Sequence, residues 1–202
     1  MKYKQKLMQK KNIAIIVQAR LTSSRLPEKV LKKISKKTII EIIHQRLSLS
    51  KFISQIVYAI PKNKKNLKLK NFLKSKKLKY FEGSENNVLD RYYNCAKKYK
   101  SEIIVRITAD CPLIDPHMLD NCLEIFIKKK IDLLINTSPP TFPDGLDINI
   151  FNAKTLHQAW KNARSKYERE HVIPFMLKNK NVKKYNCSSK KDFSSERWTL
   201  DT

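Results

Sequence analysis

The 202-residue sequence predicts a single α/β domain whose largely parallel sheet is flanked by helices. The first observation is the run Ile13–Gln18, whose nearly unbroken apolar character is typical of a strand buried on both faces. The second is segment 38–50, in which isoleucine and leucine recur at helical spacing. The third is the alternation of such strand-like and helix-like segments, which is the pattern of strand–helix–strand units.

The elements of the first half can be placed one by one. Asp115 is a suitable N-cap for a helix that starts at Pro116, because proline is well tolerated in the first turn. In a parallel sheet the carboxyl ends of the strands bind ligands, so the polar segments 18–29, 82–91 and 108–116 are expected to converge there. We expect strands at 13–18, 55–60, 78–81, 103–107 and 131–135, alternating with helices at 38–50, 65–76, 86–99 and 116–128.

The second half and the two ends are less regular. We expect residues 1–11 to be a disordered basic extension and residues 12–202 to form the domain. Because the sequence stops directly after an expected strand, we expect the domain to lack its closing C-terminal helix. The remaining expected elements are strands at 147–151, 182–186 and 197–200 and helices at 152–163 and 168–178.

Composition narrows the class of protein. No apolar run approaches the ~18–20 residues that span a bilayer, and there is no secretory signal, so we expect a cytoplasmic protein. The formal net charge is +25, but only 8 of the 43 Lys and Arg residues are Arg. Nucleic-acid binders usually cluster Arg with aromatic side chains, so we do not expect a nucleic-acid partner, although the charge keeps that alternative open. The charge favours anionic ligands.

The four cysteines and two glycines exclude several motifs. No CxxC pair is present and the four histidines complete no zinc pattern, so the thiols are expected to be free. With glycine at only two positions, neither a Walker loop nor a GxGxxG loop is present.

Two groups of charged residues follow expected strands. The loop 18–29 combines three cations (Arg20, Arg25 and Lys29) with hydroxyls, and such groups suit phosphate oxygens. Asp110 and Asp201 each follow a strand end, and two such carboxylates could share one Mg²⁺. Segments 142–147 and 168–171 could bind a polar substrate, but on their own the first is ordinarily a turn and the second ordinarily a solvated helix face.

The motifs appear in a specific order: QARLTSSRLPEKVL, GSENNVLDRY, RITADCPLIDP, FPDGLD, EREHVIPFM and RWTLDT. This order resembles the SpsF-like branch of the cytidylyltransferase family, named after a spore-coat polysaccharide biosynthesis protein and related to CMP-sialic acid and CMP-Kdo synthetases. The resemblance covers residues 12–202. It implies a Rossmann-like nucleotidyltransferase domain of the nucleotide-diphospho-sugar transferase type. It also implies a Mg²⁺-dependent reaction in which CTP and a sugar or sugar acid give a CMP-sugar and pyrophosphate for surface polysaccharide.

The resemblance also assigns residues by position. Arg20, Lys29 and Asp110 are implied to be catalytic, and Asp110 and Asp201 to hold Mg²⁺. The implied nucleotide-binding residues are Arg20, Ser23, Ser24, Arg25, Lys29, Gly83 and Arg91, and the implied sugar-binding residues are Arg106, Thr108, Asp144, Asp147 and His171. A homodimer formed around residues 140–180 is also implied.

Two positions depart from the family pattern. Thr22 and Glu28 stand where the family commonly has glycine, which lets backbone N–H groups approach phosphate. A catalytically impaired sugar-nucleotide-binding module and transfer from another nucleoside triphosphate therefore stay open. The general base also stays open, between Asp147 and a hydroxide held by the metal.

Overall fold

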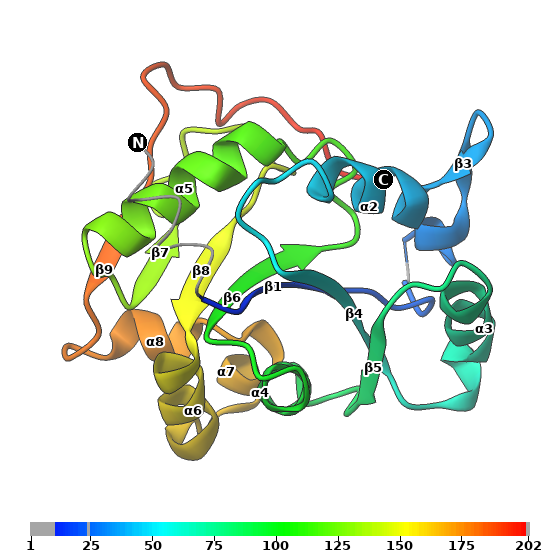
Figure 1. Cartoon of the computed structure of the whole chain (residues 1–202), viewed down its shortest axis with the longest axis horizontal. Helices are drawn as coiled ribbons and strands as arrows, with labels where there is room; N and C mark the ends of the chain where they lie inside the picture. Colours follow the sequence, from blue (N-terminus) through cyan, green and yellow to red (C-terminus); the bar gives the residue numbers. More distant parts are fainter. Residues whose placement is uncertain (1–10, 24, 201–202) are drawn as a thin grey trace.

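The computed structural model describes residues 11–23 and 25–200. Its centre is a seven-stranded mixed sheet in the order β5-β4-β1-β6-β8-β7-β9 (Figure 1). Four neighbouring strands are parallel: β5 (Tyr80–Gly83), β4 (Gln55–Pro61), β1 (Ile13–Gln18) and β6 (Ile103–Thr108). Next to β6, β8 (Asn149–Asn152) runs antiparallel to both its neighbours, while β7 (Leu133–Ile135) and β9 (Lys184–Asn186) are parallel to each other.

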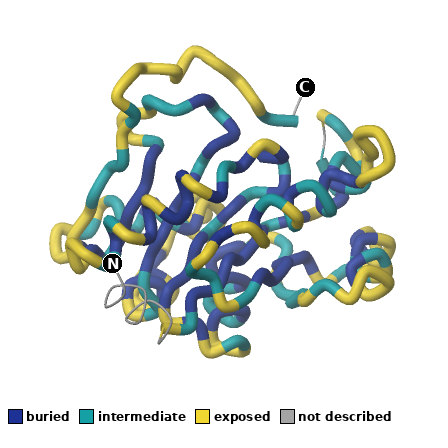
Figure 2. The backbone as a smooth tube through the Cα atoms, turned by 45° about the horizontal axis from the view of Figure 1, so that its top comes forward, coloured by how far each residue is buried: buried dark blue, intermediate teal, exposed yellow. Residues whose placement is uncertain are grey.

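Helices cover both faces of this sheet, so the central strand is buried on both sides. Ile13, Ile15 and Val17 pack into one core with residues of α2, α3 and α5, whereas Ala14 and Ile16 pack into the other with α4, α6 and α8 (Figures 1 and 2). The helices are α2 (Ile39–Leu47), α3 (Leu67–Ser75), α4 (Val88–Lys98), α5 (Pro116–Lys128), α6 (Ala153–Asn162), α7 (Lys166–His171) and α8 (Pro174–Lys178). The α/β class with a mostly parallel sheet is therefore confirmed.

Local capping explains where two helices begin. The Asp115 carboxylate accepts a hydrogen bond from the His117 amide at 2.8 Å and Pro116 opens α5, as predicted. Thr38 and Glu41 form a reciprocal capping box at the start of α2. All four cysteines are free. Within residues 11–23 and 25–200, no helix is long and apolar enough to cross a membrane.

Two local expectations are wrong, and the structure also contains short elements that were not predicted. The predicted strand 197–200 is a single bridge between Arg197 and Asp144, because this segment pairs with a loop rather than with the sheet. The predicted helix 168–178 is two short helices, since Val172 adopts a positive φ of 71° before Pro174. The segment 29–38, for which no element was predicted, holds 3₁₀-helix η1 (Lys29–Leu31) and a hairpin of β2 (Lys33–Ile34) and β3 (Lys37–Thr38), and a second 3₁₀-helix, η2 (Lys64–Asn66), precedes α3.

The segment 187–200 is a largely exposed strap that crosses the carboxyl-end side of the sheet (Figure 2). It is fixed at its far end by three backbone hydrogen bonds. Two join it to Asp144, from the Asp144 amide to the Glu196 carbonyl at 2.9 Å and from the Trp198 amide to the Asp144 carbonyl at 2.7 Å. The third joins the Leu200 amide to the Asp110 carbonyl at 3.0 Å, so the strap ends beside β6.

Candidate functional site

The carboxyl ends of β1 and β6 form the floor of a cavity of about 160 Å³. These strands are neighbours, with Gln18 opposite Thr108 in the sheet register. The polar loop after β1 and the residues after β6 therefore meet, as the parallel topology predicts. The cavity is lined by Gln18, Ala19, Arg20, Ser23, Arg25, Lys29, Val30, Thr108, Ala109 and Asp110.

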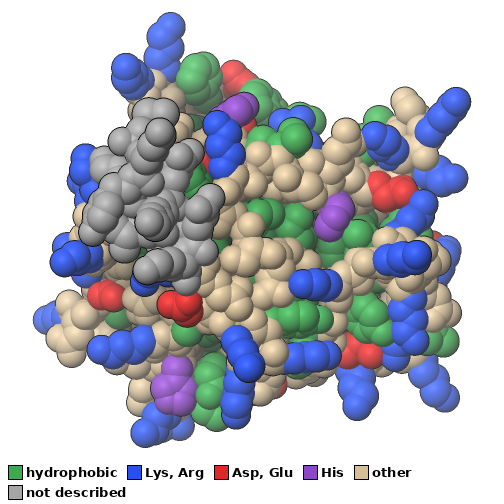
Figure 3. All heavy atoms as spheres, in the orientation of Figure 1, with side chains coloured by type: hydrophobic (Ala, Val, Ile, Leu, Met, Phe, Trp, Pro, Cys, Tyr) green, Lys and Arg blue, Asp and Glu red, His purple; other side chains and the backbone are tan. Residues whose placement is uncertain are grey.

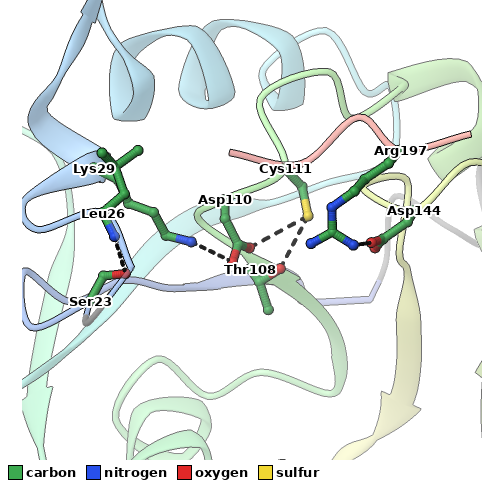
Figure 4. Close-up of polar contacts among 8 residues, drawn as sticks. All are labelled: Ser23, Leu26, Lys29, Thr108, Asp110, Cys111, Asp144 and Arg197. Atoms are coloured by element: carbon green, nitrogen blue, oxygen red, sulfur yellow. Dashed lines mark hydrogen bonds and ion pairs between the residues drawn. The ribbon is translucent and has the colours of Figure 1, made fainter. Parts of the chain in front are cut away.

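Lys29 and Asp110 form an ion pair in this cavity (Figure 4). The Lys29 Nζ lies 2.9 Å from the Asp110 Oδ2, and the two side chains are 12% and 30% exposed. The backbone around Lys29 is anchored, because Val30 is buried and Glu28 holds a left-handed conformation with φ of 55°. The cationic loop is also tied to η2 by a hydrogen bond from the Leu21 amide to the Asn66 Oδ1 at 2.9 Å.

The Asp110 carboxyl is held in its ionised form. Burial alone would raise its pKa, but the hydrogen bonds from Lys29 and Thr108 outweigh burial and lower the pKa below its ordinary value. A charged carboxylate in a cavity with three cations is suited to a polyanion that arrives with a divalent metal.

Cys111 is a neighbour that the sequence analysis did not select. Its Sγ lies 3.2 Å from the Thr108 Oγ1 and 3.6 Å from the Asp110 Oδ1 (Figure 4). Burial, together with the adjacent Asp110 charge, raises the pKa of the thiol, so Cys111 is neutral at physiological pH. It acts as a weak hydrogen-bond partner, and its position in the sequence carries no pattern that would have identified it.

Two predicted site residues, Ser24 and Asp201, lie outside the described residues. The strap nevertheless carries the chain to Asp110, since Leu200 bonds to the Asp110 backbone and immediately precedes Asp201. Gly145 makes this course possible. Its φ is +108°, and a Cβ there would lie 2.8 Å from the backbone carbonyl of Trp198.

The carboxylates of the loop before β8 lie beside this end of the sheet. The Asp144 Oδ2 accepts a hydrogen bond from the Arg197 Nη1 at 2.7 Å, and both side chains are close to half exposed (Figure 4). The pKa of Asp147 is raised by burial and by the charges of Asp144 and Asp110, against which Arg106 acts. The negative charge of Asp110 therefore contributes to the raised pKa of Asp147.

Arg106 lies two residues before Thr108 on β6. Its guanidinium donates to the Asn149 Oδ1 at 2.9 Å and to the Gln18 Oε1 at 3.4 Å, which links β6 to its two neighbours in the sheet. Within the described part of the chain its buried Nε has no hydrogen-bond partner. Thr108 lines the cavity and Arg106 does not, and the predicted role of both residues in sugar binding stays a prediction.

Gly83 and Arg91 form one packed unit. Arg91 is 1% exposed and donates to the Ser84 carbonyl. A Cβ on Gly83 would lie 2.8 Å from the Arg91 Cγ, so the glycine makes room for this side chain. Burial, opposed by Tyr92 and reinforced by the nearby Arg20 charge, lowers the pKa of Arg91 to about 10. Arg91 does not line the cavity, whereas Arg20 does.

His171 is distant from this arrangement. It is exposed at the end of α7, its ring lies 4.5 Å from that of Tyr167, and it does not line the cavity. Because α7 packs on α4, His171 belongs to the layer on that face of the sheet (Figure 1). Its role in sugar binding stays a prediction.

A second, wider cavity of about 960 Å³ lies between α5, the loop 142–146 and the strap. It was not predicted, because it depends on how the strap folds back. Its walls include three exposed apolar side chains, Leu113, Phe193 and Trp198. Many Lys and Arg side chains are spread over the face of the molecule seen in Figure 3, in keeping with the net charge of +25.

A magnesium site at Asp110 fits the described residues. No group of three His, Cys, Asp or Glu residues that could hold a metal occurs among residues 11–23 and 25–200. Mg²⁺ usually binds one or two carboxylates together with substrate phosphates, so it does not need such a group. Asp110 offers one ionised carboxylate inside a cation-lined cavity, and Asp201 follows the residue that bonds to the Asp110 backbone.

A model of the cytidylyltransferase family matches residues 14–199. An uncharacterised protein of Methanocaldococcus jannaschii is 39% identical over 167 residues, which are 83% of this chain and 68% of that protein. The spore coat polysaccharide biosynthesis protein SpsF of Bacillus subtilis is 29% identical over 149 residues, 72% of this chain and 61% of SpsF. The chain thus spans about two thirds of the length of these relatives.

Solved structures show the same fold. A cytidylyltransferase from Leptospira borgpetersenii superposes with a TM-score of 0.90 at 35% identity, covering 95% of this chain and 82% of that one. A CMP:2-keto-3-deoxy-manno-octonic acid synthetase complexed with CTP superposes with a TM-score of 0.68 at 16% identity, covering 95% and 94% of the two chains. At that identity the second likeness concerns the fold alone.

Proposed function

Because this chain belongs to the cytidylyltransferase family, we propose that it transfers the cytidylyl group of CTP to a sugar or sugar acid and releases pyrophosphate. The observation that carries the proposal is the ionised Asp110 paired with Lys29 in a cavity that also contains Arg20, Arg25 and Ser23. A phosphate chain with a divalent ion is the ligand whose charges complement this set.

The reaction would be an in-line displacement at the α-phosphorus. The sugar hydroxyl forms the new P–O bond while the bond to pyrophosphate breaks. Arg20, Arg25 and Lys29 would bind the departing phosphate oxygens, where negative charge accumulates. A Mg²⁺ held by Asp110 and Asp201 would supply further neutralisation of that charge.

Asp147 would accept the proton of the sugar hydroxyl. Its pKa is raised by burial and by two neighbouring carboxylates, which makes it a better base than an exposed aspartate. Asp144 would bind sugar hydroxyls from the same loop, together with Arg106 and Thr108 of β6, the strand next to β8.

We propose the wider biological role by analogy with relatives of this chain. One is a spore coat polysaccharide biosynthesis protein and another a 3-deoxy-manno-octulosonate cytidylyltransferase, so the product would be a CMP-sugar for surface polysaccharide, made in the cytoplasm.

We expect a homodimer formed around residues 140–180. Size-exclusion chromatography with light scattering tests this, and a purely monomeric chain would contradict it.

The test of the proposed activity is a pyrophosphate-release screen with CTP, ATP, GTP and UTP, each with Mg²⁺ and a panel of sugars and sugar acids. We expect release with CTP, and a loss of ~10²–10³-fold or more in Asp110→Asn, the cost of removing one electrostatic group at a reacting centre. Asp115→Asn is the matched control. Asparagine can also cap α5, and residue 115 does not line the cavity that contains Asp110. Equal turnover in the two variants would refute the role of Asp110.

One observation favours a second candidate function, that of a catalytically impaired sugar-nucleotide-binding module. Glu28 holds a left-handed conformation at a position where the resemblance suggests glycine. Its carboxylate forms an ion pair with Lys68, however, and it does not line the cavity. CTP binding in calorimetry without pyrophosphate release from any nucleotide would favour this candidate.

A further inference from the structure

The ammonium of Lys29 binds the carboxylate that the proposed function assigns to a metal. Nζ bonds to the Asp110 Oδ2 at 2.9 Å, and the side chain is only 12% exposed (Figure 4). A divalent cation on the same oxygen would lie close to this ammonium and would be repelled by its charge. The ion pair and a metal at that oxygen are therefore alternatives.

We propose that Lys29 is an exchangeable occupant of Asp110, which leaves for the triphosphate when nucleotide binds and thereby opens the carboxylate to the metal. This inference rests on the proposed function, since it assumes a nucleotide in the cavity. It adds a coupling between two ligands of the site that neither the fold nor the family resemblance assigns.

The local structure suits Lys29 to such an exchange. Its backbone is held by η1 and by the buried Val30, while its charge sits at the end of a flexible four-carbon stem. Arg20, Arg25 and Ser23 line the same cavity of about 160 Å³ as Lys29, so a phosphate bound by them would lie beside the Lys29 side chain.

The coupling must be reciprocal. If triphosphate raises the affinity for metal by releasing Asp110, then the metal raises the affinity for triphosphate by the same factor, because it releases Lys29. In the absence of nucleotide, the chain should bind a divalent ion weakly even though its carboxylate is ionised.

The test measures the binding of Mn²⁺ and the binding of CTP in separate experiments. Mn²⁺ binding to the nucleotide-free chain is followed by electron paramagnetic resonance, and CTP binding by calorimetry in the presence of a chelator. In Lys29→Met we expect Mn²⁺ to bind at least tenfold more tightly than in the wild type, and metal-free CTP at least tenfold more weakly. Opposite changes are the signature of an exchange.

Two variants serve as controls. Lys68→Met removes the same charge from an ion pair with Glu28 outside the cavity, and should change neither binding. Lys29→Arg places a planar fork that can bind a carboxylate through two nitrogens, and should bind Mn²⁺ no better than the wild type. Circular dichroism establishes that each variant is folded.

The outcomes separate the two proposals. Equal Mn²⁺ affinity in Lys29→Met and the wild type, or the same gain in Lys68→Met, overturns the exchange. Asp110→Asn, made in the Lys29→Met background, should abolish Mn²⁺ binding. If Mn²⁺ binding persists there, the metal site of the proposed function is wrong, and the exchange fails with it.

Discussion

Replacing Gly145 by alanine should release the strap from the loop that carries Asp144. Gly145 has a φ of +108°, and the new Cβ would lie 2.8 Å from the carbonyl carbon and oxygen of Trp198. Such a backbone conformation costs a residue with a Cβ of order 1–3 kcal/mol. The clash is with backbone, which cannot rotate away as a side chain would.

The expected loss of stability follows from two alternatives. Either the strain is retained, or the strap gives up its two hydrogen bonds to Asp144, at 2.9 and 2.7 Å. Because each bond contributes ~0.5–1.5 kcal/mol net, both routes lower the free energy of unfolding by about 2 kcal/mol. The proposed activity should fall more steeply, since Asp201 follows the strap residue that bonds to Asp110.

Urea denaturation and pyrophosphate release measure these two effects, and limited trypsin cleavage at Lys190 and Lys191 reports whether the strap is detached. Ser195→Ala is the control, because it changes an exposed residue of the same segment. If Gly145→Ala kept the stability, the cleavage rate and the activity of the wild type, the account of the strap would be refuted.

The remaining predictions concern the scaffold. The pKa of Glu41 is lowered from 4.5 to about 2, chiefly by its hydrogen bond with Lys76, so this carboxylate stabilises the fold fully above pH 4.5 and loses its contribution as the pH falls to about 2. Urea denaturation across the acid range should therefore show a weaker pH dependence in Glu41→Gln, and an unchanged dependence would contradict the capping box. Tyr92→Phe removes a buried hydrogen bond from the Tyr92 hydroxyl to the Ile16 carbonyl at 3.1 Å, and should lower the free energy of unfolding by about 1 kcal/mol with CTP affinity unchanged. A loss of CTP affinity in calorimetry would show that the core behind the site also shapes it.

Much of the fold could be predicted because its signals are local. The apolar run of β1 and the cap and proline of α5 each fix an element from a few adjacent residues. The meeting of loop 18–29 with Asp110 follows from parallel topology alone. None of these predictions required knowledge of a contact between residues distant in the sequence.

The errors lie where distant partners decide the structure. Segment 197–200 has the composition of a strand but pairs through a single bridge to Asp144. Arg91 is buried because Gly83, eight residues earlier, leaves space for it, and no periodicity reveals that. Cys111 is a different case, because its contacts with Thr108 and Asp110 are local in the sequence and the sequence analysis did not select it.

The most direct measurement is a crystal structure of the chain with CTP and Mg²⁺. We expect one Mg²⁺ bound by carboxylate oxygens of both Asp110 and Asp201 at ~2.0–2.1 Å, with the triphosphate against Arg20 and Arg25 and with Lys29 on phosphate. A triphosphate bound elsewhere, or a metal bound without Asp110, would contradict this expectation.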